Sequence, residues 1–255
     1  MKTMNCTTIA LVLLLAAGTS QAVWIGATNG TTDDDAHNYT NVMNWAGGVI
    51  DDDFSGVTLT GATTLYFTGD HATGANGLST SYTGNYALTL RSSGGDRTLT
   101  LNGDVVHQPV SAPTLTFGAT GTGNGLNLDL GGGNRTFYAG FDDSARRITI
   151  ARGVLSNGGF VKAGRGQMDI IGTNPCEGPT AVNNYLVLMP SGSAIRNSPE
   201  IAITTTTSYT SQIEVKQMAG AEDRFGDVAD FMFSTEGGGN YHATMQFYVS
   251  TANNE

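Results

Sequence analysis

The stretch Gly158–Leu188, GGFVKAGRGQMDIIGTNPCEGPTAVNNYLVL, decides the fold that the sequence predicts. It contains two short strand-like runs, Met168–Ile171 and Tyr185–Leu188. Apolar and polar side chains alternate before and through the first run, with the period of two that gives a β-strand one apolar face. Glycine reaches positive φ at little cost and therefore marks sharp turns. The glycines at the predicted turns are Gly164, Gly166, Gly172 and Gly178. The stretch thus predicts one coil of a stacked β-structure, without a catalytic constellation.

The order of residue types along this stretch carries a resemblance. The positions concerned are Gly159, Lys162, Gly164, Gly166, Met168, Ile170, Gly172, Asn174, Gly178, Thr180 and Val182. Their order resembles the autotransporter-associated β-strand repeat, also called the passenger-associated transport repeat, of bacterial exported proteins. Gln167 stands where that repeat usually has threonine, and Cys176 stands where it usually has an aromatic residue, which indicates a diverged copy. The resemblance implies a right-handed parallel β-helix on an exported or cell-surface protein, and it implies no reaction.

Composition favours an all-β fold. Charged residues make up 13% of the 255-residue chain, and 35 residues are glycine. Low charge with many turn-forming residues is typical of all-β proteins, and the apolar alternation argues against disorder. Composition predicts an all-β fold, and the resemblance implies its form: a right-handed parallel β-helix (β-solenoid) that is single-stranded and pectin-lyase-like in shape, with an N-terminal cap. The formal net charge of −10 argues against nucleic-acid binding, which depends on basic patches.

Short strand-like runs recur along the chain, separated by clusters of glycine, asparagine, aspartate or serine. The predicted strands outside the central stretch are Val57–Leu59, Thr64–Phe67, Tyr86–Leu90, Thr98–Leu101, Thr114–Phe117, Leu126–Leu130, Thr136–Ala139, Arg147–Ile150, Glu200–Thr204 and Gln212–Val215. In stacked coils their apolar residues point inward. The residues that we expect in this core are Leu88, Leu90, Leu99, Leu101, Leu126, Leu128, Leu130, Ile148 and Ile150.

The N-terminus has the pattern of a secretory signal peptide. Lys2 gives a positive start, Ile9–Ala17 forms an apolar run, and Ser20 and Ala22 are small residues at the expected cleavage positions. We expect cleavage after Ala22 and no transmembrane segment in the mature chain, since no second long apolar segment follows. Cleavage would leave Cys176 as the only cysteine, so that no internal disulfide can form. These features predict a secreted or cell-surface protein.

Four segments are predicted along the chain. They are a signal peptide at 1–22, an N-terminal cap at 23–56, a β-helix at 57–218 with the repeat motif at 158–188, and a C-terminal rung, cap or truncated continuation at 219–255. We interpret Trp24 and Trp45 as aromatic cover for the open end of the first coil, in preference to ligand stacking. In the last segment, Tyr241–Val249 alternates like a closing strand, and Ala219–Phe231 is compatible with one or two helical turns.

Motifs for chemistry are absent from the sequence. The histidines show no metal-ligand spacing, and we expect surface loops at His37, His71, His107 and His242. The acidic runs Asp33–Asp35 and Asp51–Asp53 lack the glycine and terminal glutamate of a calcium loop, so solvated turns are favoured over calcium binding. The sequence therefore predicts no catalytic, cofactor-binding or metal-binding residue, and no cofactor.

Two functions are left open by the sequence. We favour an exported, non-catalytic β-solenoid, a structural or adhesive surface module of autotransporter-passenger type whose ligand is a glycan or a protein. The alternative is a carbohydrate-binding or carbohydrate-cleaving β-helix, which rests on fold analogy alone. Its candidate charged residues are Asp142, Asp143, Arg146 and Arg147. Its candidate sugar-stacking aromatics, which fill coil positions in the other reading, are Tyr82, Tyr86, Tyr138 and Tyr209.

Overall fold

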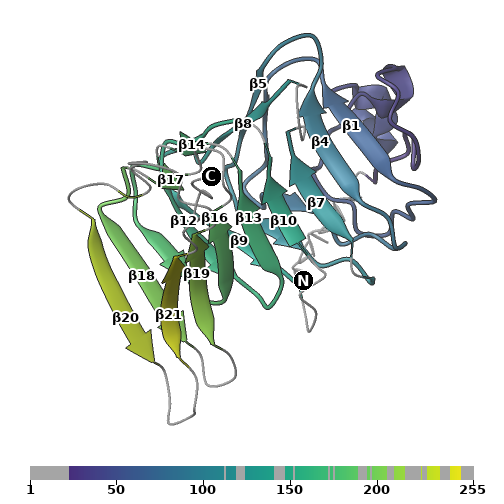
Figure 1. The fold of residues 1–255 in the computed structure, drawn as a ribbon. Coiled ribbons are helices and arrows are strands. Elements are labelled where there is room, and N and C mark those ends of the chain that lie inside the picture. The colour runs from purple at the N-terminus through teal and green to yellow at the C-terminus, as the bar shows by residue number, and fades with distance from the viewer. Residues whose placement is uncertain are drawn as a thin grey trace, which may run out of the picture.

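Parallel β-strands build almost all of the chain that the structure, a computed structural model, describes (Figure 1). The described residues are 23–111, 113–118, 124–140, 147–151, 153–171, 173–174, 176–188, 194–195, 197–205, 210–215, 225, 229–235 and 242–247. The predicted signal peptide at 1–22 lies outside them. Helix is confined to three short 3-10 turns near the start of this part, η1 (Asp35–His37), η2 (Val42–Asn44) and η3 (Ala46–Gly48).

The largest sheet has eight strands, which run side by side down the molecule (Figure 1). In spatial order they are β1 (Thr63–Phe67), β4 (Leu88–Ser92), β7 (Thr114–Phe117), β10 (Arg147–Ile150), β13 (Gln167–Ile170), β16 (Tyr185–Leu188), β19 (Ser211–Val215) and β21 (Ala243–Phe247). Every neighbouring pair in this sheet is parallel.

Three further sheets complete the described strands. The seven-stranded sheet consists of β3 (Leu78–Ser79), β6 (Val105–His107), β9 (Asn134–Ala139), β12 (Gly159–Ala163), β15 (Thr180–Val182), β18 (Glu200–Thr205) and β20 (Asp230–Thr235). The four-stranded sheet consists of β2 (His71–Ala72), β5 (Arg97–Thr100), β8 (Leu126–Asp129) and β11 (Leu155–Ser156). The smallest sheet pairs β14 (Thr173–Asn174) with β17 (Ala194–Ile195).

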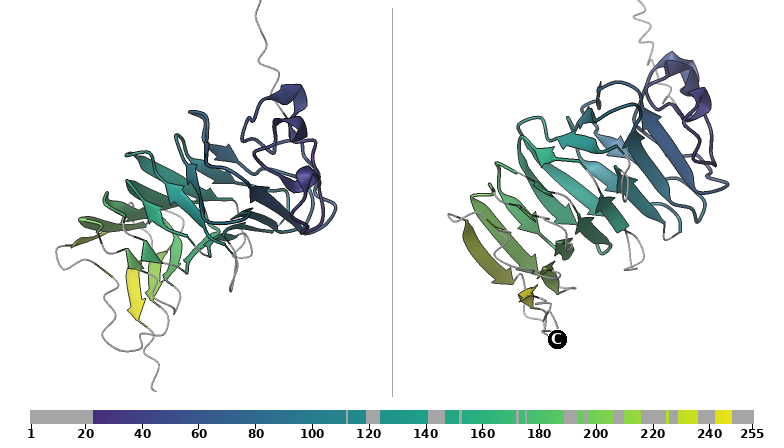
Figure 2. Two further views of the ribbon diagram at one scale, coloured as in Figure 1. Left: turned by 90° about the horizontal axis from the view of Figure 1, so that it is seen from above. Right: turned by 45° about the horizontal axis from the view of Figure 1, so that its top comes forward.

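The strand order shows how the chain moves between the sheets. In all four sheets, neighbouring strands are three places apart in chain order, except for the last pairs β18–β20 and β19–β21, which are two places apart. The chain therefore visits the sheets in turn. The step between paired residues varies from 18 residues between Gln167 and Tyr185 to 33 residues between Thr114 and Arg147. Figure 2 shows the strands stacked in sequence order along the long axis. This all-β arrangement of parallel sheets is compatible with the predicted β-helix.

The core consists of side-chain rows that cross every strand of a sheet. In the eight-stranded sheet one row joins Leu65, Leu90 and Phe117 in register and continues to Ile150 and Ile170. All five side chains are fully buried, because the next strand covers each of them. The leucines and isoleucines that the sequence places inside are likewise 0% exposed, which confirms that part of the prediction.

Aromatic side chains cover the N-terminal end of the stack. Trp24 and Trp45 are 3% and 1% exposed, and their ring centroids lie 5.2 Å apart in an edge-to-face contact. Tyr39 stacks on Phe67 of β1 with centroids 4.4 Å apart. These residues belong to the same buried cluster as the core rows. The two tryptophans therefore pack as cover for the first coil, as predicted.

One prediction about local structure is wrong, and a second lies mostly outside the described residues. Val57–Leu59 forms no strand, because only Thr58 makes an isolated bridge, to Thr83, while Val57 and Leu59 still join the core. The described residues at the end of Ala219–Phe231 begin strand β20 instead of a helix, and most of that segment lies outside the described residues. Within the part of the chain that the structure describes, no helix has the length and apolar character needed to cross a bilayer.

Candidate functional site

A ladder of polar side chains lies on the outer face of the eight-stranded sheet. Residues alternate along each strand, so the positions between the buried rows point away from the core. We call the following side chains the polar ladder: Arg147, Gln167, Asp169, Tyr185, Gln212, Glu214 and Gln246. Register places Arg147, Gln167, Tyr185 and Gln212 in one row, one residue from each of four neighbouring strands. The ladder therefore follows from the register of consecutive coils.

Asp169 is the first carboxylate of the ladder. Its side chain is only 3% exposed although it points away from the core. Arg147, one strand earlier, approaches it with Nη1 3.2 Å from Oδ2, and Gln167 donates from Nε2 to Oδ1. A buried carboxylate needs such donors, because an unpaired charge away from water is costly.

Glu214 repeats the arrangement further along the sheet. It is 2% exposed, and its Oε2 accepts a hydrogen bond from the hydroxyl of Tyr185, which lies one strand earlier. Gln212 then donates from Nε2 to Oε1 of Gln246 at 3.1 Å. In each case a residue in one row contacts a residue in the next row of the following strand, so diagonal pairs tie successive coils together.

The ladder offers hydrogen-bonding groups at the spacing of the strands. Parallel strands lie about 4.8 Å apart, so Asp169 and Glu214, two strands apart, have backbone positions separated by roughly 9.6 Å. That backbone separation is slightly larger than the roughly 6.5–9.5 Å between the carboxyl groups of pairs that activate a water. Both carboxylates are buried against donors, whereas the Arg147 side chain is 43% exposed. The accessible chemistry of the ladder is therefore hydrogen bonding to a polar ligand.

The repeat-motif glycines lie where neighbouring coils touch. A Cβ atom at Gly164 would lie 2.3 Å from the carbonyl oxygen of Ala139, and Gly164 has φ +76°. A Cβ at Gly178 would lie 2.4 Å from the nitrogen of Gly159, in the coil before. Gly166 donates its N–H to the same Ala139 carbonyl at 2.9 Å. Gly164 and Gly178 therefore need glycine for coil contact, whereas Gly166 contributes a backbone hydrogen bond.

Lys162 is the motif residue with the least ordinary environment. It is fully buried in an inward row of β12, between Phe137 of β9 and Val182 of β15. Its Nζ donates to the carbonyl oxygens of Ala163 and Gly164, both at 2.8 Å. Burial lowers the pKa of Lys162 to about 7. The ammonium group thus ties the end of β12 to the turn that follows it.

The remaining motif residues divide between core and turn. Met168 and Ile170 of β13, and Thr180 and Val182 of β15, are fully buried. Asn174 lies in β14, and its side chain lies outside the described residues, as does Gly172. The motif therefore brings its apolar members into the core rows and its glycines to the coil contacts.

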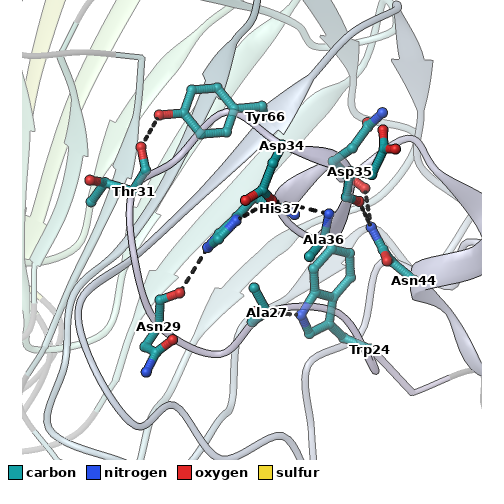
Figure 3. A network of polar contacts seen from close by, with 11 residues as sticks. Trp24, Ala27, Asn29, Thr31, Asp34, Asp35, Ala36, His37, Asn44 and Tyr66 are labelled. Carbon is teal, nitrogen blue, oxygen red and sulfur yellow. Dashed lines mark hydrogen bonds and ion pairs between the residues drawn. The ribbon is translucent and has the colours of Figure 1, made fainter.

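A network of polar contacts fixes the N-terminal cap (Figure 3). His37 lies between Asp34 and Asn29, with Nδ1 2.6 Å from the Asp34 carboxylate and Nε2 2.8 Å from the Asn29 carbonyl oxygen. Burial alone would lower the pKa of His37, but these hydrogen bonds raise it above its ordinary value. The hydrogen bond from His37 in turn lowers the pKa of Asp34. Asn44 and Trp24 tie down neighbouring loops through the Asp35 and Ala27 carbonyl oxygens.

A second cap network centres on the buried carboxylate of Asp52, which is 2% exposed. Its Oδ1 accepts from the Tyr39 hydroxyl at 2.6 Å and lies 2.7 Å from Nε2 of His71, while its Oδ2 accepts from the Gly74 N–H at 3.2 Å. Burial, together with the negative charge of Asp52, raises the pKa of Tyr39 well above its usual value. The network joins the cap to β2, which His71 begins.

Several predicted positions need correction. His107 is fully buried, with Nδ1 2.9 Å from the Thr80 hydroxyl and Nε2 3.0 Å from the Pro113 carbonyl oxygen, and His37 is 7% exposed. His71 begins strand β2 and bonds to Asp52, so none of these three histidines lies in a surface loop. Tyr82 is fully buried and cannot stack on a sugar, whereas Tyr86 is 44% exposed. The partner of Arg147 is Asp169, while the other members of its predicted cluster and Tyr209 lie outside the described residues.

The polar ladder was missed by sequence reasoning, although one signal was present. That signal is the polar position of Asp169 between Met168 and Ile170, which marks its side chain as outward-facing. Among the described residues, no three histidine, cysteine, aspartate or glutamate side chains gather as metal ligands would. In the acidic runs, Asp53 accepts from the N–H and hydroxyl of Ser55, and Asp33 accepts from the Ser93 hydroxyl. The prediction of solvated turns is wrong for Asp52, which is 2% exposed.

No family model, curated protein or solved structure matches this chain. The resemblance at 158–188 therefore stays a prediction, and the functional argument depends on the geometry.

Proposed function

We propose that the chain is an exported, non-catalytic, right-handed parallel β-helix that serves as a structural or adhesive module at the cell surface. The observation that carries this proposal is the stack of eight parallel strands held in register, with buried rows running through it. Such a stack is stiff and presents long, regular faces. Right-handedness is expected because parallel crossover connections are almost always right-handed.

The glycine contacts and the buried Lys162 support the repeat interpretation. Both lie at positions that the predicted repeat motif marks: the glycines allow contact between coils, and Lys162 ties the end of β12 to the turn that follows it. The N-terminal pattern at 1–22 supports export. The sheet face supports a scaffold, because its two buried carboxylates are each engaged by a neighbouring side chain.

An assay for polysaccharide cleavage tests whether the protein is non-catalytic, as proposed. Purified protein is incubated with a panel of acidic and neutral polysaccharides, and reducing ends and unsaturated products are measured over a day. We expect no product above a heat-denatured control. Cleavage of any polysaccharide that is lost on Asp169→Asn or Glu214→Gln would overturn the non-catalytic assignment.

Export and shape are tested separately. N-terminal sequencing of protein recovered outside producing cells should begin at Val23, and protein retained inside with an intact Met1 would contradict export. Small-angle scattering should give an elongated particle, because eight stacked strands extend roughly 34 Å along the axis.

Glycan binding on the polar ladder is a second candidate. One row of the polar ladder presents planar or charged hydrogen-bonding groups at a spacing of about 4.8 Å. Its residues are Arg147, Gln167, Tyr185 and Gln212. A linear polysaccharide offers hydroxyl groups at a comparable repeat along its length.

Affinity electrophoresis in polysaccharide gels would detect glycan binding, and Tyr185→Ala is expected to abolish the retardation. The control is Thr98→Ala on the four-stranded sheet, and equal retardation of both variants would rule this face out.

A further inference from the structure

The last strand of the seven-stranded sheet, β20, forms an open edge. It pairs with β18 on one side and has no strand on its other side among the described residues. All six of its residues are exposed, including Phe231 at 40%, Met232 at 47% and Phe233 at 54%. No lysine, proline or bulge protects this edge, although edge strands usually carry such protection.

Phe231 and Phe233 stand in rows that are buried everywhere else along β15 and β18. Phe231 follows Thr180 and Ile201 in one row, and Phe233 follows Val182 and Ile203 in the next. All four earlier residues are 0% exposed, because another strand covers them. The two phenylalanines are therefore core-type side chains that lack the covering strand.

Backbone direction shows what kind of partner fits. Asp230 donates its N–H to the Pro199 carbonyl oxygen at 3.0 Å, toward β18. Along a parallel strand, successive residues bond alternately to one side and the other. The N–H and C=O groups of Phe231, Phe233 and Thr235 therefore point toward the open edge. The partner that fits them is another β-strand.

The opposite end of the stack excludes a head-to-tail partner. There Gly30 and Asn38 bridge to β1, and Asp53 bridges to β3, beneath the aromatic cap. A second copy therefore cannot offer its first coil to β20. What a second copy does offer is its own β20, an exposed apolar strand of equal length, and like surfaces that meet about a two-fold axis form a closed dimer.

We propose that β20 pairs antiparallel with β20 of a second copy, about a two-fold axis at Phe233, to form an end-to-end dimer. This register places Phe233 opposite Phe233, Phe231 opposite Thr235, and Met232 opposite Ser234. Residues that face each other across antiparallel strands lie on the same face of the sheet, so inward side chains meet inward side chains. All three residues with edge-directed backbone groups become hydrogen-bonded, and the two seven-stranded sheets join.

Charge favours this contact in an acidic protein. The chain carries a formal charge of −10, yet Asp230 is the only charged residue in β20 and β21. In the proposed register the two Asp230 residues lie six positions apart, roughly 20 Å at the rise of an antiparallel strand, so they do not face each other. Each Asp230 instead stands opposite position 236, a glutamate just after the partner's strand, so the contact is confined to Phe231–Thr235. Strand β20 itself is thus a low-charge, apolar edge from Phe231 to Thr235.

Sedimentation velocity of the purified chain over a concentration series tests the dimer. We expect a monomer–dimer equilibrium, and Phe233→Lys should raise the dimer dissociation constant at least about ten-fold, because two lysines would meet at the axis. The control Met43→Lys changes a side chain that is 75% exposed in the cap and should leave the dimer intact. A monomer at every concentration, or an unchanged dimer of Phe233→Lys, would overturn the proposal.

Cross-linking tests the register without relying on a destabilised variant. In a Cys6→Ser background, Phe233→Cys should form a disulfide-linked dimer on mild oxidation, since opposite residues of a hydrogen-bonded pair have Cα atoms about 5.5 Å apart. Met232→Cys, its exposed neighbour, should not. Cys176 does not compete, because it is buried and burial raises its pKa to about 12. Cross-linking at 232 in preference to 233 would contradict the proposed pairing.

Discussion

Lys162 has an environment that lysine rarely occupies. A fully buried side chain in an apolar row usually belongs to leucine or isoleucine, yet here it carries an amine. Two backbone carbonyl oxygens accept from its Nζ, and burial lowers its pKa to about 7. The residue therefore couples the stability of the central coil to pH.

The pH dependence of unfolding should reveal this coupling. An unfolded lysine titrates near pH 10.4, so between about pH 7 and 10 the unfolded chain binds more protons than the folded chain, and the free energy of unfolding rises with pH. We expect Lys162 to contribute a rise on the order of 2–4 kcal/mol across this range. Chemical denaturation at pH 7, 8.5 and 10 should show the rise in wild type but not in Lys162→Met. Parallel pH profiles of the two proteins would show that the amine is not buried.

Gly164 allows a test of coil contact at one backbone position. Alanine there needs an unfavourable positive φ and also places a Cβ 2.3 Å from the Ala139 carbonyl oxygen. Gly94 has a similar φ of +68°, but a Cβ there meets no atom within 4 Å. We expect Gly94→Ala to cost about 1–2 kcal/mol from φ alone, and Gly164→Ala at least about 2 kcal/mol more. Equal losses in thermal unfolding would show that the coils do not touch at Gly164.

At the scale of the strand, a charge in a core row should prevent correct stacking. Ile170 of β13 is fully buried between Ile150 and Leu188. Ile170→Asp should destabilise the fold by several kcal/mol, because the carboxylate would be desolvated without a partner. Val161→Asp, on the outward and partly exposed side of β12, is the matched control and should cost less than about 1 kcal/mol. Circular dichroism melting curves compare the two, and a wild-type melting temperature for Ile170→Asp would place that residue outside the core.

Strands with strong apolar alternation could be predicted, and short or polar ones could not. Thr114–Phe117, Arg147–Ile150 and Tyr185–Leu188 were located to the residue, since each puts two apolar side chains in the core rows. The two-residue strands β2 and β11 have no periodic signal, so only the tertiary register reveals them. Strand β20 was missed because its apolar run carries no alternation.

Side chains whose surroundings come from distant segments also escaped prediction. His107 is buried and lies 2.9 Å from the hydroxyl of Thr80, 27 residues earlier, a contact that no local pattern predicts. The polar ladder joins Tyr185 to Glu214 across 29 residues for the same reason. Which residues become neighbours depends on coil length, and the coils differ in length.

At the scale of the whole molecule, the cap should stabilise only the coils near it. In a stack, each coil contacts mainly its neighbours, so damage at one end spreads weakly. Trp45 is 1% exposed and donates its Nε1 N–H to the Tyr39 carbonyl oxygen at 3.0 Å. Trp45→Ala should cost about 3–5 kcal/mol, whereas Ile25→Ala, at a side chain that is 62% exposed, should have little effect.

Hydrogen exchange would show where that loss falls. Amides of β1, β2 and β3 should exchange faster in Trp45→Ala, while those of β13 and β16 keep their wild-type protection. A uniform loss of protection across all strands would mean that the stack unfolds as one cooperative unit.

The unequal steps between paired strands have a practical consequence for protein engineering. Pairing stays in register whether 18 or 33 residues separate the partners, so the extra residues are carried by the connections. Peptides grafted into those connections should leave the stacked body unchanged, because lengthening a loop adds little closure entropy. The scaffold could then display several foreign epitopes in a line, each at a height set by the coil that bears it.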